Sequence, residues 1–147
     1  MSDPRIIGYL NRALAHELSA VQQYLTQARL TALWDMESFS RDLRQEADEE
    51  LAHADRVISR LLYYGIAPKG GSLSPVRLGR SKAELLLQNL DMEQDAIRLY
   101  EEAADYCRRR GAHEDAALFE AIRDEELDHL RGMEQQLFDE RDGGRHG

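Results

Sequence analysis

The hexapeptide DEELAH occupies residues 48–53, and the nearly identical hexapeptide DEELDH occupies residues 124–129. The two segments start 76 residues apart and differ at only one of six positions. Each contains a glutamate followed three residues later by a histidine, and residues three apart on an α-helix share one face. Glu50 with His53, and Glu126 with His129, can therefore each direct two metal-ligating side chains toward one point.

The same offset relates two further glutamates, Glu17 and Glu93, each of which stands 33 residues before the glutamate of a Glu-x-x-His pair. Both lie among apolar residues that recur every three or four positions, a pattern typical of a helix that buries one face. The chain is thus read as two copies of one helix pair. A single Glu-x-x-His is commonly a solvated surface pair, but chance rarely produces two copies at an identical separation.

Capping residues and helix breakers divide the first half of the chain into two long helices. Asp3 as N-cap and Pro4 at the first helical position begin a helix that fades near Trp34. Asp35 is expected to cap a second helix, which runs to about Tyr64 before a glycine.

A loop separates this pair from the second pair. Residues 65–80 include four glycines and two prolines, which predict irregular structure. Ser81 with Glu84 forms a capping-box pattern that begins a third helix, and Gly111 ends it. A fourth helix is expected over about residues 113–142.

These expectations define an all-α fold with residues 1–142 as one domain and residues 143–147 as a flexible tail. Short connections make the helices of each pair antiparallel neighbours, whereas the loop of 16 residues can cross the whole bundle. One long crossover between the second and third helices distinguishes a ferritin-like four-helix bundle from a simple up-and-down bundle.

Composition excludes several classes of function. The chain has 147 residues with a formal net charge of −9, which suits one globular domain and disfavours nucleic acid as a partner. The single cysteine, Cys107, permits neither an intrachain disulfide nor a cysteine-rich metal motif. Neither a membrane-spanning apolar run nor a signal sequence is evident, so we expect a cytoplasmic protein without a membrane partner.

The four glutamates are expected to point into the protein, where their negative charges require nearby positive charges. Burying an unpaired charge costs several kcal/mol, whereas two divalent ions would neutralise four glutamates. Carboxylate and imidazole ligands suit iron or manganese rather than a metal that prefers thiolates.

The chain resembles the bacterioferritins over about residues 5–140. The resemblance rests on the segment YLNR at residues 9–12, the run from Glu17 to Tyr24, the segment ELAHADR at residues 50–56, and RDEE at residues 123–126 leading to His129. It implies a ferroxidase centre that binds two iron ions per chain, with ligands Glu17, Glu50, His53, Glu93, Glu126 and His129. Glu50 and Glu126 are its implied bridging ligands, and Tyr24 matches the tyrosine beside the centre.

The resemblance also implies a function and an assembly. Iron(II) would be oxidised by oxygen or hydrogen peroxide, and the ferric product would be stored as mineral. Two-fold dimers would build a hollow shell of 24 subunits. A di-metal redox enzyme of the peroxidase or oxygenase type, without storage, is the alternative. A DNA-protecting miniferritin is disfavoured, because a single chain here supplies all six ligands and is acidic.

The sequence departs from the family pattern at three places, and these departures change what we expect for haem binding and for the C-terminus. Leu51 stands where the family has a haem-ligating methionine, and leucine cannot bind iron, so we expect no haem. Gln45 replaces a histidine that faces the storage cavity. The sequence ends at Gly147, before the family's short fifth helix, so the expected protein is a haem-free and C-terminally short variant.

The roles of two tyrosines stay open at this point. Tyr24 follows Glu17 by two helical turns, which favours a hydrogen bond to a ligand carboxylate over simple core packing. Tyr100 is its counterpart in the second half of the chain, and packing and hydrogen bonding are equally compatible with its position.

Overall fold

The computed structural model describes residues 2–146, with side chains described for residues 2–141. Within these residues helices are the only regular elements, so the all-α prediction is confirmed. The chain divides into two compact units, Met1–Val76 and Arg77–Gly147, and each unit contains one pair of helices. None of the described helices combines the length and the apolar character of a membrane span.

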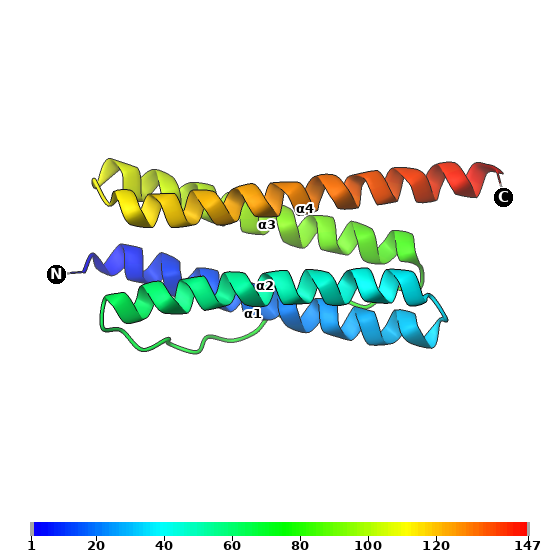
Figure 1. The fold of residues 1–147 in the computed structure, drawn as a ribbon, viewed down its shortest axis with the longest axis horizontal. Coiled ribbons are helices and arrows are strands. Elements are labelled where there is room, and N and C mark those ends of the chain that lie inside the picture. Colours follow the sequence, from blue (N-terminus) through cyan, green and yellow to red (C-terminus); the bar gives the residue numbers. More distant parts are fainter. Residues whose placement is uncertain (1, 147) are drawn as a thin grey trace. The chain divides into compact units, whose positions relative to one another are not determined.

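The first unit contains α1 (Pro4–Leu33) and α2 (Glu37–Tyr63), which lie side by side and antiparallel (Figure 1). The predicted start of α1 is confirmed: an Asp3 carboxylate oxygen accepts a hydrogen bond from the Arg5 backbone N–H at 2.8 Å. The apolar stripe of each helix faces its neighbour, and the Ser40 hydroxyl of α2 donates to the Ala28 carbonyl of α1 at 2.7 Å.

The expected role of Asp35 was wrong. Met36 is the N-cap of α2, without a side-chain capping bond, and Asp35 instead belongs to the end of α1. Asp35 has a positive φ of 60°, its N–H donates to the Ala32 carbonyl at 3.1 Å, and the Met36 N–H donates to the Thr31 carbonyl at 2.9 Å. This pair of hydrogen bonds is the Schellman arrangement, which requires a left-handed residue just after the helix.

Glycine fills the corresponding position at two other helix ends. Gly65 after α2 has a φ of 71°, and Gly111 after the third helix has a φ of 72°. The residue after each glycine donates its N–H back to the helix: Ile66 to the Leu61 carbonyl at 3.0 Å, and Ala112 to the Cys107 carbonyl at 2.8 Å. These two helix ends lie where the sequence predicted them.

The segment after α2 runs back along α1 rather than turning tightly (Figure 1). The Lys69 N–H donates to the Asn11 side-chain oxygen at 3.1 Å, and farther along the Ser74 N–H donates to the Ser19 hydroxyl oxygen at 2.9 Å. The loop therefore follows α1 in the direction of its C-terminus, as a long crossover connection does.

The second unit contains α3 (Lys82–Arg109) and α4 (His113–His146), which are also antiparallel neighbours. The predicted cap of α3 is confirmed, because the Ser81 hydroxyl accepts from the Glu84 N–H at 3.1 Å. An ion pair between Lys82 and Glu140 at 3.9 Å joins one end of the pair.

The fourth helix is longer than the sequence indicated, since α4 continues to His146 rather than ending near residue 142. The flexibility expected for residues 143–147 stays a prediction. Their side chains, and the whole of Gly147, lie outside the described residues.

Because Asp35 occupies a conformation that favours glycine, Asp35→Gly should stabilise the protein. A non-glycine residue in the left-handed region costs about 1 kcal/mol, although aspartate tolerates it better than most residues. Glycine also makes the unfolded chain more flexible, which offsets part of this gain, so we expect the free energy of unfolding to rise by only about 0.5 kcal/mol in urea denaturation. The matched control, Ala52→Gly in the middle of α2, should lower it by about 1 kcal/mol. A lower stability of Asp35→Gly would show that the aspartate side chain stabilises this turn.

Candidate metal centre

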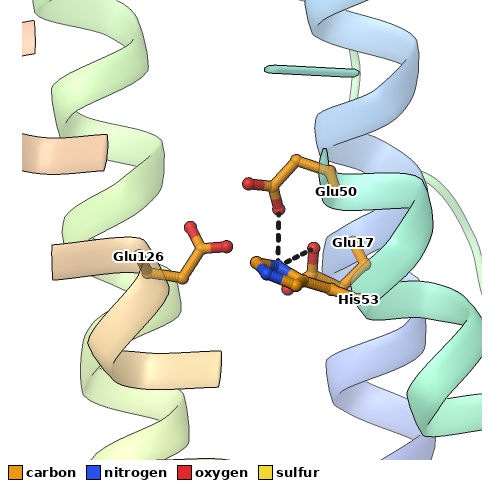
Figure 2. Close-up of side chains that lie close together, drawn as sticks. All are labelled: Glu17, Glu50, His53 and Glu126. Atoms are coloured by element: carbon orange, nitrogen blue, oxygen red, sulfur yellow. Dashed lines mark ion pairs between the residues drawn. The ribbon is translucent and has the colours of Figure 1, made fainter. Parts of the chain in front are cut away.

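Three ligand-type side chains meet inside the first unit. Glu17 comes from the middle of α1, and Glu50 and His53 come from the middle of α2. Their exposed fractions are 0%, 1% and 2%, so all three are fully buried. The His53 Nδ1 atom lies 3.5 Å from Glu17 Oε2 and 3.7 Å from Glu50 Oε2, and Figure 2 shows both carboxylates directed at the imidazole ring. We call Glu17, Glu50 and His53 the N-terminal cluster.

The second unit contains an equivalent group. Glu93 comes from α3, and Glu126 and His129 come from α4. Glu93 and Glu126 are buried with exposed fractions of 1% and 0%, whereas His129 is partly exposed. We call these three residues the C-terminal cluster.

Each cluster is compact enough to hold a metal ion. One ligand atom from each of Glu17, Glu50 and His53 lies within 4.8 Å of the other two, and the same is true of the C-terminal cluster. The structure thus gathers the predicted ligands three by three, each set within its own helix pair. Helical spacing explains the grouping, because a Glu-x-x-His pair shares one face and the lone glutamate comes from the antiparallel neighbour.

The chemistry of these donors fits iron. Each cluster offers two carboxylates and one imidazole, a set that suits iron or manganese better than metals selecting thiolates. Buried carboxylates are unfavourable without compensating cations, and divalent ions would supply that charge. The one cysteine, Cys107, is buried on α3 and belongs to neither cluster.

The two tyrosines noted from the sequence are both inside the protein. Tyr24 and Tyr100 each have an exposed fraction of 0%. Each follows the lone glutamate of its unit by seven residues, which places glutamate and tyrosine on one stripe of the helix. Sequence reasoning overlooked two buried alanines in the same repeat, Ala20 and Ala96, although the 76-residue offset relates them as well.

Two positions that we noted from the resemblance lie on the surface. Leu51 is 53% exposed on α2, and Gln45 is exposed on the same helix. The segment Glu37–Tyr63 contains no methionine, and its only histidine is the buried His53. The hydrocarbon side chain of Leu51 itself has no atom that could bind haem iron.

Comparison with known proteins assigns the chain to a family. The ferritin-like domain family matches residues 7–141. A bacterioferritin of Rhodobacter capsulatus is 36% identical over 135 residues, covering 92% of this chain and 84% of that protein. A bacterial ferritin of Synechocystis is 30% identical over 135 residues, covering 91% of this chain and 86% of that protein.

A solved structure agrees with this assignment. The Rhodobacter capsulatus bacterioferritin structure superimposes with a TM-score of 0.90 and 36% identity, covering 93% of this chain and 86% of that chain. It is described as having a metal-free dinuclear site and haem iron in a crystallographic special position. The four-helix fold with one long crossover that the sequence predicted is thereby confirmed. The chain belongs to the bacterioferritins, within the family of ferritin-like domains.

Proposed function

We propose that the protein is a ferroxidase and an iron-storage subunit, which oxidises iron(II) and retains the ferric product. The observation that carries this proposal is the pair of buried carboxylate–imidazole clusters, repeated at an offset of 76 residues in a bacterioferritin chain. A repeat of ordinary surface glutamates would not keep both the lone glutamate and the paired glutamate buried in each copy.

We further propose that the two clusters contribute to one centre for two iron ions. Each unit provides only three of the six expected ligands, so residues 1–142 would act as a single functional domain. The four glutamates would neutralise two iron(II) ions, and the two histidines would bind in the neutral form. Glu50 and Glu126 are the proposed bridging ligands, as the resemblance to the bacterioferritins implies, and both are fully buried.

In the proposed reaction iron(II) is the substrate. Each ion loses one electron, and the electrons pass to oxygen or hydrogen peroxide. The protein's contribution is to collect the ions without reorganising, because the ligands lie on helices that are already packed. The buried carboxylates favour the more highly charged ferric product, and the surrounding apolar side chains limit access of water.

We propose that haem is absent. The resemblance places Leu51 at the position of the family's haem ligand, and its hydrocarbon side chain has no donor atom. The related Rhodobacter capsulatus protein is described with haem iron, so this chain would differ from it in its cofactor.

We propose that the protein is a homo-oligomer built from two-fold dimers, assembled into a cytoplasmic shell of 24 subunits. Several large apolar side chains of the first unit remain exposed, as expected for a surface that contacts another subunit. They are Leu25, Leu33, Leu51, Leu62 and Tyr63. Storage needs such an assembly, since a single helical bundle encloses no cavity for mineral.

Oxidation should depend equally on the two clusters. Glu17→Ala and Glu93→Ala should each slow aerobic iron(II) oxidation by more than about 100-fold, because even outer-shell partners of metal ligands contribute 10- to 100-fold. Both variants should remain folded, since each loses a carboxylate from a crowded buried cluster. Stopped-flow absorbance of the ferric product measures the rate, with the exposed Glu125→Ala as the matched control. A well-folded Glu17→Ala variant with the wild-type rate would refute the assigned ligands.

The particle mass separates storage from the alternative function. A shell that retains many iron ions per subunit supports storage. A strictly monomeric protein that binds two ions would contradict it and favour a di-metal redox enzyme of the peroxidase or oxygenase type.

Metal should stabilise the fold, because only the folded chain gathers the ligands. Cobalt(II) at 100 times its dissociation constant should add about 2.7 kcal/mol to the free energy of unfolding, seen as a higher Tm. His53→Ala should lose most of the shift, whereas Asp55→Asn, at an exposed position on the same helix, should keep it. An equal shift in both variants would mean that cobalt binds elsewhere.

The proposal that the protein binds no haem can be tested by introducing the methionine that the family has at position 51. Wild-type protein expressed with ample haem should show no Soret band, whereas Leu51→Met should acquire one if residue 51 lies where two subunits share a haem. Leu51→Ile controls for the size of the side chain. Stoichiometric haem in the wild-type protein would contradict the proposal.

A further inference from the structure

The two halves of the chain share a longer pattern than the metal ligands alone. Residues 17–24 and residues 93–100 both read Glu-x-x-Ala, then valine or isoleucine, then x-x-Tyr. The glutamate, the alanine and the tyrosine are buried in both copies, with exposed fractions of at most 1%. The repeat therefore preserves a tyrosine and a small residue together with each lone glutamate.

Helix geometry relates these three residues in α3. Glu93, Ala96 and Tyr100 are separated by three and then four positions, so they form one stripe along the helix. Side chains on a helix lean toward its N-terminus, so we expect the tyrosine ring to extend back over Ala96 toward the level of Glu93. The methyl group of alanine leaves room that a longer side chain would occupy.

The facing helix fixes the aromatic ring from the other side. The Tyr100 and Phe119 rings have centroids 6.1 Å apart and planes tilted by 38°. Phe119 precedes Glu126 by seven residues, just as Tyr100 follows Glu93 by seven. Because α3 and α4 are antiparallel, the Cα atoms of Tyr100 and Phe119 lie at one level, two helical turns from those of Glu93 and Glu126.

Packing alone does not explain a tyrosine in this layer. Phenylalanine satisfies the apolar surroundings at position 119, and a buried tyrosine additionally requires a partner for its hydroxyl group. The ligand carboxylates are suitable acceptors, and a hydrogen bond from a hydroxyl to a carboxylate is stronger than one between neutral groups.

We propose that Tyr100 is a positioning residue whose hydroxyl group donates a hydrogen bond to a carboxylate ligand of the metal centre, as the counterpart of Tyr24. The inference rests on the proposed function, since it requires the glutamates to bind metal. The centre would then be held by two tyrosines, one from each half of the chain. Each hydrogen bond would fix the orientation of one carboxylate before metal arrives.

The substitution Tyr100→Phe removes the hydroxyl group and keeps the ring against Phe119. We expect it to lower cobalt(II) affinity about tenfold and to alter the visible absorption of bound cobalt, with little change in the Tm of the metal-free protein. Tyr24→Phe should have a similar effect. Tyr106→Phe, at a half-buried position of the same helix, is the matched control and should leave cobalt binding unchanged.

A second measurement needs no variant. Zinc(II) binding to the wild-type protein should perturb the ultraviolet difference absorbance of two buried tyrosines, and Tyr100→Phe should remove about half of that signal. Wild-type affinity and an unchanged cobalt spectrum in Tyr100→Phe would overturn the inference and leave Tyr100 a packing residue. If wild-type protein itself binds no cobalt, the proposed function fails first, so the two failures are distinguishable.

Discussion

The burial of carboxylates is the constraint on which the rest of this structure depends. Glu17, Glu50, Glu93 and Glu126 are all at most 1% exposed, and water therefore cannot screen their charges. Such positions persist only where the surrounding fold is stable enough to hold them, or where a bound cation offsets the cost. Long helices with continuous apolar stripes provide the first condition. The imidazoles of His53 and His129 lie beside these carboxylates and are of a kind that can bind such a cation.

The sequence predicted the fold well because each helix pattern is local. Apolar spacing specified four helices, and the Asp3 and Ser81 caps lie at their predicted helix starts. The error at Asp35 has a simple cause: aspartate favours both an N-cap and a left-handed turn, and the residue alone does not distinguish them. The end of α4 was misplaced because glycines 143 and 144 predict a break, yet the helix continues through them.

The candidate ligands were also predictable, because the Glu-x-x-His spacing and the 76-residue repeat are patterns of the sequence itself. Their environment was not predictable. His53 and His129 occupy equivalent repeat positions, but His53 is 2% exposed and His129 is partly exposed. This difference depends on side chains that surround each histidine in the folded chain, which the repeat does not specify. Likewise, the sequence alone does not show that Ala20 and Ala96 leave room for a tyrosine ring, because this requires knowing that Tyr24 and Tyr100 are buried.

Comparison of the two halves of the chain shows which repeated positions are identical at the candidate site and which differ at the surface. The one difference between the hexapeptides is Ala52 against Asp128, and both positions are exposed. The buried glutamates, by contrast, are the same in both copies, and so are the alanines and tyrosines. Metal-binding clusters of the same kind would constrain both copies equally, whereas exposed positions are free to differ. If the tyrosines only filled space, leucine or phenylalanine would serve in either half, so their joint retention points to the hydroxyl groups.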